Sequence, residues 1–526
     1  MTSVSQWCYA GASMHRKNLT LWILAGLGVG LLISALLGLR DSSAVARYEF
    51  TADDAYHTPV LALQPRAWQR GPSAIVVHGY SGSKEMMQAI ARSLAESGMA
   101  VYCPDLPGSG DSSERYRREE MRGALRGFYH FLLAKGYIQS GKVALIGHSM
   151  GGGLVTQLAC ETDGIRATVA ISSAPAGLGS QRPLNFLAVL GGRDLPGLQD
   201  TTIRMMQEAT SGAIFQNGQE TGDIANGTAR RLLVVAGANH LGVVYSLQAI
   251  REIQEWLGRT FGLRSLPQPS RRMLWVGVSY VGIFFLFIPL AALMGAVKQP
   301  REVLSFDHRA GWRNNLMWLP AGLLALLILR YWSPLGFVRI EAGAYLASFF
   351  LLAGLIRIVL TRLTQTPEPS LDLDDLMTSV LLGFVSFLFL YLTFGAITHR
   401  NWFYMLEGAG RLKWFAVVAL GISPFFIEDE KVGRSVQEDN SVMTSYFYSM
   451  GGKVCILAVL LLPIVSPFFR APRFLLTIGF PFLVVFFTIF QLLSVVLYHF
   501  TRRTMATAVF NILLFAWLLT APFVQA

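Results

Sequence analysis

Short apolar runs, most of them followed by a turn that contains glycine, recur along the first half of the chain. Segments with helical spacing of apolar residues separate these runs. The alternation predicts a mostly parallel β-sheet with helices on both faces, an α/β fold. A hairpin at residues 47–67 is expected to lead into the sheet. The predicted parallel strands are residues 73–77, 99–103, 143–146, 167–171, 185–190 and 231–236.

The pattern changes at residue 273, where apolar stretches become long enough to cross a bilayer. A span needs about 20 apolar residues. The second half is therefore predicted to be an all-α bundle of about eight transmembrane helices. The stretches are 273–296, 315–330, 341–361, 377–398, 413–427, 453–469, 474–499 and 505–524.

One further apolar run, residues 19–39, follows His15, Arg16 and Lys17. A cleaved signal peptide has the same pattern, but this run is long enough to span and Ser34 begins a poor cleavage site. We interpret it as a retained anchor. The preceding basic residues predict a cytoplasmic N-terminus and an α/β domain on the other side of the membrane.

These patterns divide the chain into four parts. Residues 1–42 are the tail and first transmembrane helix, and 43–262 the extracytoplasmic α/β domain. Residues 263–272, with two prolines, form a linker. Residues 273–526 form the multi-span membrane domain.

Composition agrees with a membrane protein. Hydrophobic residues make up 52% of the 526 residues and charged residues 15%, which is too apolar for an ordinary soluble protein. The net charge of +11 comes without a basic stripe interleaved with aromatics, so we predict no nucleic-acid partner. No run of carboxylates is expected within the membrane, and Arg357 and Lys453 are expected to extend from span ends toward water.

The strongest chemical signal is Gly147-His148-Ser149-Met150-Gly151. A buried strand precedes it and a helical segment follows. G-x-S-x-G in a strand–turn–helix is typical of a nucleophile elbow, in which a tight turn exposes the serine hydroxyl.

Two more polar residues follow predicted strands. Asp194 comes after the strand at 185–190, and His240 after the strand at 231–236. Ligands of parallel sheets lie at the carboxyl ends of the strands, so Ser149, Asp194 and His240 are expected to meet there.

This order of serine, acid and histidine resembles that of the α/β-hydrolase superfamily, and the resemblance covers about residues 47–258. Capless lipases, esterases and lysophospholipases are the most similar members, because only about a dozen residues are available for a lid. The resemblance implies Ser149 as nucleophile, His240 as base and Asp194 as its partner, without cofactor or metal. None of the nine histidines stands at metal-ligand spacing with a second histidine or cysteine.

The residues around the elbow have supporting roles in this interpretation. The oxyanion hole would use the backbone N–H groups of Tyr80 and Met150. His78 is expected to shape the oxyanion loop, and Asp105 to stabilise its own turn. The supporting residues of the elbow and loop are His78, Gly79, Gly147, His148 and Gly151.

The sequence therefore predicts a membrane-embedded serine hydrolase that cleaves a lipid or lipophilic ester through an acyl-enzyme. A peptidase or thioesterase would use the same triad, and a receptor or transporter could use the fold as a binding module. The arrangement is also similar to that of GPI inositol-deacylases, but this chain lacks their extra domain, so their substrate is not carried over. The pattern leaves the oligomeric state open. We expect the loop at residues 399–413 to lie against the hydrolase domain.

Overall fold

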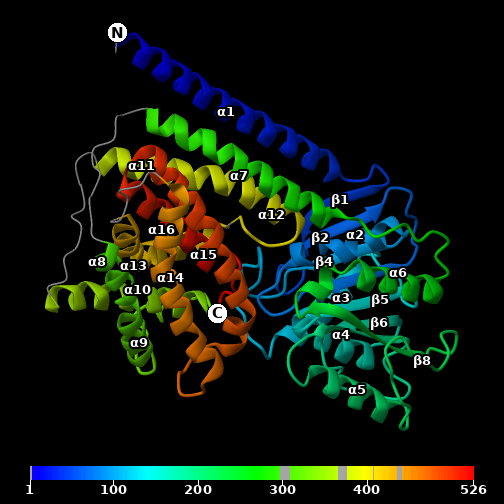
Figure 1. Cartoon of the computed structure of the whole chain (residues 1–526). Helices are drawn as coiled ribbons and strands as arrows, with labels where there is room; N and C mark the ends of the chain where they lie inside the picture. The colour runs from blue at the N-terminus through cyan, green and yellow to red at the C-terminus, as the bar shows by residue number, and fades with distance from the viewer. Residues whose placement is uncertain (1–2, 297–307, 365–375, 407, 435–440) are drawn as a thin grey trace. The chain divides into compact units, whose positions relative to one another are not determined.

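The computed structural model describes residues 3–296, 308–364, 376–406, 408–434 and 441–526 (Figure 1). They form two compact units. The sheet unit comprises Leu39–Val276, Thr398–Met405 and Pro522–Ala526, and the helical unit comprises Met1–Gly38, Gly277–Ile397 and Leu406–Ala521. Two short segments from the second half of the chain therefore belong to the sheet unit.

The sheet has nine strands in the order β1-β2-β4-β3-β5-β6-β7-β9-β8. The six central strands are parallel to one another, and they lie in the order β4-β3-β5-β6-β7-β9. The β1–β2 hairpin adds to one edge in antiparallel orientation, and β8 to the other. The strands are β1 (Val45–Thr51), β2 (Pro59–Pro65), β3 (Ser73–Val77), β4 (Ala100–Pro104), β5 (Val143–His148), β6 (Ile165–Ile171), β7 (Phe186–Arg193), β8 (Glu220–Thr221) and β9 (Arg230–Asn239).

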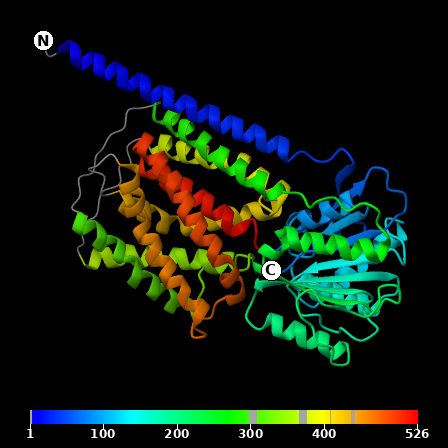
Figure 2. The same ribbon diagram turned by 45° about the vertical axis from the view of Figure 1, so that its right-hand side comes forward.

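Helices cover both faces of this sheet (Figure 2). Because successive side chains of a strand point to opposite faces, Ala74 and Val76 pack with α2 and α6, whereas Ile75 and Val77 pack with α3 and α4. The predicted α/β fold is confirmed. The helices of the sheet unit are η1 (Lys84–Met87), α2 (Gln88–Glu96), α3 (Met121–Ala134), α4 (Met150–Glu161), α5 (Leu198–Ala209), η2 (Gly242–Tyr245) and α6 (Leu247–Phe261).

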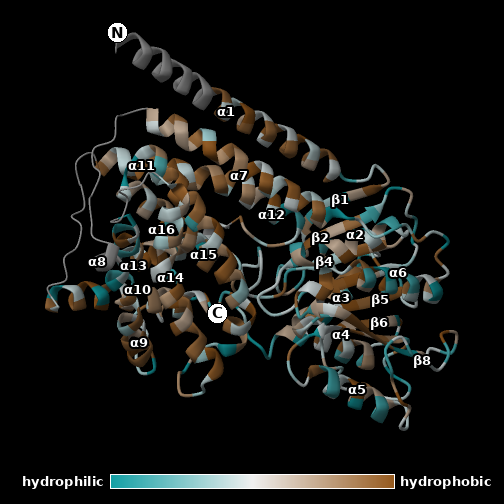
Figure 3. Cartoon of the chain, in the orientation of Figure 1, coloured by the Kyte–Doolittle hydropathy of each residue, from teal (hydrophilic) through white to brown (hydrophobic). Residues whose placement is uncertain are grey.

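The second half of the described chain is helical and strongly apolar (Figure 3). Within the described residues, seven helices are long and apolar enough to cross a membrane, and α1 is one of them. The stretches predicted at 315–330 and 505–524 form shorter helices, of 12 and 17 residues. The helices are α1 (Ser3–Gly38), α7 (Arg272–Ala296), α8 (His308–Leu316), α9 (Trp318–Leu329), α10 (Gly343–Leu363), α11 (Leu376–Leu390), the π-helix η3 (Tyr391–Gly395), α12 (Ala396–Asn401), α13 (Ala409–Arg434), α14 (Val442–Val465), α15 (Arg473–Thr501) and α16 (Thr504–Thr520).

Three consecutive carboxylates lie inside the helical unit, which the sequence analysis did not expect. Glu428 pairs with Arg357 of α10 at 2.5 Å, and Asp429 pairs with Lys453 of α14. Glu430 pairs with Arg434 of its own helix. The prediction that Arg357 and Lys453 extend toward water is wrong, because both are buried.

The reason is the length of α13. The apolar stretch ends at residue 427, but the helix continues to Arg434 and carries the three carboxylates into the bundle. Successive residues of a helix point about 100° apart, so neighbouring helices can each supply a partner. Asn511 of α16 donates a hydrogen bond to Glu430 as well, at 2.8 Å.

We predict that Lys453→Met alone lowers the free energy of unfolding by about 3–5 kcal/mol, because it leaves the Asp429 carboxylate buried without its cation. The double variant Lys453→Met, Asp429→Leu should recover most of this loss. Chemical unfolding in mild detergent measures both.

The matched control is the Arg251–Glu255 pair, whose side chains are 34% and 48% exposed. Glu255→Ala should cost less than about 1 kcal/mol. Additive effects of the two bundle substitutions would contradict the pairing.

Candidate active site

Ser149 lies in a strained turn between β5 and α4. Its backbone has φ 52° and ψ −117°, a conformation that residues with a side chain rarely adopt. The Ser149 N–H donates to the Ile171 carbonyl of β6 at 2.8 Å, which ties the turn to the sheet. A Cβ at Gly147 would collide with the Gly151 carbonyl, and one at Gly151 with the His78 carbonyl. The tight turn therefore requires both glycines.

The predicted triad residues form one continuous chain of hydrogen bonds. Ser149 Oγ lies 3.0 Å from Nε2 of His240, and Nδ1 of His240 lies 2.6 Å from Oδ1 of Asp194. The carboxylate accepts the Nδ1–H, which leaves Nε2 as the acceptor for the serine hydroxyl. The three side chains follow β5, β7 and β9 at their carboxyl ends.

Strand register explains why Asp194 and His240 meet. The regular pairing of β7 with β9 runs to Gly191 and Val235, and after an irregularity in the register Arg193 pairs with Asn239, the last residue of each strand. The next residue of each strand is therefore Asp194 or His240.

Asp194 is held by more than the histidine. The Ser172 hydroxyl donates to its Oδ2, and the backbone N–H groups of Gly191 and Leu195 donate at 3.2 and 2.8 Å. Burial raises the pKa of Asp194, but the hydrogen bonds from His240, Ser172 and Leu195 outweigh burial, so its pKa lies below the usual value. Asp194 is therefore ionised and can orient the imidazole of His240.

Ser172 is a residue of the site that the sequence analysis missed. Its place offered a signal, since it directly follows β6, which lies between β5 and β7 in the sheet. Its backbone has φ 46°, and its N–H donates to the Val189 carbonyl at 2.7 Å. The turn thus points its hydroxyl at Asp194.

His148 holds the backbone of His240. Its Nε2–H donates to the His240 carbonyl at 2.8 Å, and its side chain is buried. Burial, and next the charge of His240, lower the pKa of His148 to about 3. This imidazole is therefore neutral, and its structural contact supports the predicted supporting role.

His78 has both ring nitrogens occupied. Nδ1–H donates to the Gly79 carbonyl at 2.7 Å, and Nε2 accepts from the Leu106 N–H at 3.1 Å. Burial lowers its pKa, so this histidine is neutral too. It links the loop after β3 to the loop after β4, as expected for a residue that shapes the oxyanion loop.

Met150 directly follows Ser149, and Tyr80 lies in the loop after β3. Met150 is the first residue of α4, and the first N–H groups of a helix have no acceptor within that helix. The Tyr80 ring packs edge-on against Tyr116, with ring centres 4.9 Å apart, and the Tyr116 hydroxyl lies 3.9 Å from the Met150 sulfur. The oxyanion role of the two N–H groups stays a prediction.

Three carboxylates near this site, Glu85, Asp105 and Asp111, lie close enough together to suggest a metal. The Lys84 ammonium contacts all three, at 3.1, 2.7 and 2.5 Å. It supplies the positive charge that a cation would bring, so the group does not indicate a metal site. Asp105 also accepts from the backbone N–H of Lys84 and Asp111, which agrees with its expected turn role.

Part of the loop predicted at 399–413 belongs to the sheet unit. Tyr245, the last residue of η2, donates from its hydroxyl to the Trp402 carbonyl at 3.1 Å. The two aromatic rings meet edge-on. Asp111 interacts with the Tyr404 hydroxyl. Residues 398–405 therefore lie against the hydrolase fold, as expected.

We predict that stability falls as the pH is lowered from about 6.5. The pKa of folded His148 lies below its value of 6.5 in an unfolded chain, so between about 6.5 and 3 the unfolded chain binds the extra proton. One such proton changes the free energy of unfolding by about 1.4 kcal/mol per pH unit. His148→Asn, which retains an N–H donor, should show a shallower slope between pH 6.5 and 4.5 in chemical unfolding. Equal slopes for both proteins would show that His148 does not remain neutral.

The comparisons with known proteins agree with this geometry. Residues 73–244 match the family model described as the alpha/beta hydrolase fold. A curated relative, the dihydrolipoyllysine-residue acetyltransferase component of the acetoin cleaving system of Cupriavidus necator, is 30% identical over 177 residues. The match covers 30% of this chain and 46% of that protein, so the chain spans under half the length of this relative.

Two solved structures are each similar to about two fifths of the chain. A CIB-like hydrolase from Thermoplasma acidophilum is 23% identical, with a TM-score of 0.32 over 41% of this chain and 99% of that one. An esterase from Pyrococcus furiosus is 16% identical, with a TM-score of 0.31 over 41% and 91%. The family match and the observed sheet together show that residues 73–244 have the alpha/beta hydrolase fold, and the same chain carries a helical part.

Proposed function

We propose that this protein is a serine hydrolase that cleaves carboxylic esters, and that its substrate is a lipid or a lipophilic acyl ester at a membrane. The observation that carries the proposal is the hydrogen-bonded chain from Ser149 through His240 to Asp194. A serine hydroxyl is a weak nucleophile and needs a base within hydrogen-bond distance.

In the first half of the reaction, Ser149 Oγ attacks the ester carbonyl carbon and its proton passes to Nε2 of His240. Asp194 stabilises the imidazolium that forms. The N–H groups of Tyr80 and Met150 would stabilise the tetrahedral oxyanion. His240 then gives its proton to the leaving alcohol, and the acyl group remains on Ser149.

In the second half, water takes the place of the alcohol. His240 removes a proton from the water, whose oxygen attacks the acyl carbon. The bond to Ser149 breaks, Oγ recovers the proton, and the carboxylic acid leaves. His148 and Ser172 contribute by position, since they hold the His240 carbonyl and the Asp194 carboxylate.

Two observations support a lipophilic substrate. Residues 172–185, between β6 and β7, contain turns and bends but no lid helix. Seven of the helices that the structure describes are suited to a membrane, one before the hydrolase fold and six after it. An acyl pocket without a lid exposes apolar surface to its surroundings. A membrane-bound enzyme would meet its lipid substrate at the membrane surface. We retain the orientation with a cytoplasmic N-terminus and an extracytoplasmic hydrolase as part of this proposal.

We predict that a fluorophosphonate probe labels the full-length protein, and that Ser149→Ala abolishes both labelling and esterase activity. The probe reacts only with a serine whose hydroxyl is activated by a base. In-gel fluorescence and hydrolysis of a chromogenic ester measure the two effects. Ser180→Ala, at an exposed serine of the sheet unit, should change neither.

Asp194→Asn is the companion variant. It preserves the shape of the side chain but favours the wrong imidazole tautomer, so kcat should fall by about 10⁴. Labelling of Ser149→Ala at the wild-type level would refute the nucleophile, and full activity of Asp194→Asn would refute the acid.

We predict that kcat/KM rises with acyl length when full-length protein in vesicles is given ester substrates, from short soluble esters to long-chain lipids. A longer chain buries more apolar surface in the acyl site, worth about 0.8 kcal/mol per CH₂ group. Matched thioesters and peptides complete the panel, with Ser149→Ala as the blank. Faster turnover of thioesters or peptides, or a preference for short esters, would contradict the proposed substrate.

A further inference from the structure

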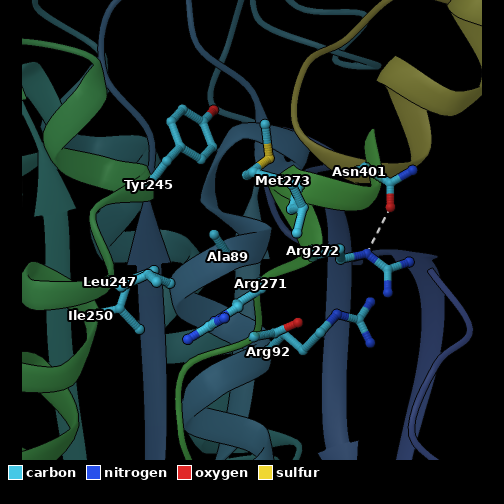
Figure 4. Close-up of a pocket in the computed structure, with 11 residues that line it drawn as sticks. Ala89, Arg92, Tyr245, Leu247, Ile250, Arg271, Arg272, Met273 and Asn401 are labelled. Carbon is cyan, nitrogen blue, oxygen red and sulfur yellow. Dashed lines mark hydrogen bonds between the residues drawn. The ribbon is translucent and has the colours of Figure 1, made fainter. Parts of the chain in front are cut away.

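A cavity of about 200 Å³ lies in the sheet unit, between α2, α6 and the start of α7 (Figure 4). It is distinct from the residues of the triad. Its walls are mostly apolar, with three arginines, a tyrosine and an asparagine among them. The lining residues are Ala89, Arg92, Tyr245, Leu247, Ile250, Ser270, Arg271, Arg272, Met273, Leu274 and Asn401.

Arg92 is the main reason to expect a ligand here. Its side chain is 3% exposed, and none of its three guanidinium nitrogens has a hydrogen-bond acceptor among the residues that the structure describes. Its Nη1 lies 3.1 Å from Oδ1 of Asp41, an ionic contact. A buried guanidinium with unused N–H groups costs free energy unless an acceptor reaches it.

The charges around the cavity do not balance. Asp41 also contacts Arg272 at 3.2 Å and Arg400 at 3.5 Å, so one carboxylate serves three arginines. Burial lowers the pKa of Arg92, and Asp41 and Glu96 oppose this effect without reversing it. An anion in the cavity would supply the missing negative charge.

The other polar groups are already oriented. Arg272 donates from Nε to Asn401 at 2.6 Å, a contact that Figure 4 shows, and this fixes its planar guanidinium. Guanidinium groups held in this way suit the oxygens of a phosphate, which accept two parallel hydrogen bonds. Exposed Arg271 lies at the mouth and adds a third cation.

The position in the chain indicates where the phosphate comes from. Arg272 is the first residue of α7, a 25-residue apolar helix suited to crossing a membrane. The first turn of such a helix lies at the depth of lipid headgroups, where basic residues bind anionic lipids. Leu247, Ile250, Met273 and Leu274 offer apolar contacts for the start of an acyl chain.

We propose that this cavity binds the phosphate headgroup of an anionic phospholipid, and that Arg92, Arg271 and Arg272 contact the phosphate oxygens. The inference rests on the proposed membrane span of α7 but not on catalysis at Ser149. The lipid would be held at a site separate from the ester that is cleaved.

The test uses full-length Ser149→Ala protein in mild detergent, so that hydrolysis cannot consume the ligand. Thermal shift and isothermal titration are recorded with dioctanoyl phosphatidylglycerol, dioctanoyl phosphatidylcholine, inorganic phosphate and octanoate. We expect saturable binding of phosphatidylglycerol that is at least tenfold tighter than binding of the other three.

Arg92→Gln and Arg271→Gln, each added to this protein, should weaken binding of phosphatidylglycerol at least tenfold. Arg271 is exposed, so its replacement tests the site even if Arg92→Gln does not fold. The matched control is Arg122→Gln, at an arginine on α3 that is 48% exposed, and it should bind as before. Equal binding of phosphate or octanoate, or unchanged affinity in Arg271→Gln, would overturn the proposal. If the wild-type protein has no esterase activity, the proposed function fails, but the proposed lipid site does not.

Discussion

The register between β7 and β9 is the constraint on which the candidate active site depends. The two strands end at paired residues, and the acid and the histidine are the next residue of each. The elbow after β5 adds the serine from the other side of β6. A shift of one residue in either strand would turn its side chains to the opposite face and separate the acid from the base. The positions of Ser149, Asp194 and His240 therefore depend on the pairing of the parallel strands more than on any single loop.

Neutral and neutralised groups hold the loops around this site. His78 and His148 are buried without charge, and each fixes a backbone carbonyl or N–H of a neighbouring loop. Lys84 does the same work with charge, because three carboxylates surround its ammonium. Nε2 of His78, Nε2 of His148 and the Lys84 ammonium each contact a group distant in sequence, so these contacts connect the loops that follow different strands. In this arrangement the Ser149 hydroxyl lies at hydrogen-bond distance from His240.

Buried charges are paired in the helical unit but not fully paired around the cavity beside α7. In α13 each carboxylate has a cation from a neighbouring turn or helix, so Asp429 and Lys453 neutralise each other. Around Arg92 the cations exceed the carboxylates, and the guanidinium keeps unused donors. The first arrangement stabilises helix packing. The second leaves a place for an anion, which is why the cavity and not the bundle carries the proposed lipid site.

The sequence alone determined the strands, the elbow at Ser149, and the apolar helices, because each follows from local periodicity or a short motif. It also placed Asp194 and His240 after strands, and the order of the three residues resembled a known family. Tertiary structure decided the rest. Ser172 reaches Asp194, and Arg357 reaches Glu428, across separations that no local pattern encodes. Such partners depend on strand order and helix packing, since a side chain's neighbours in space are set by elements far away in the chain.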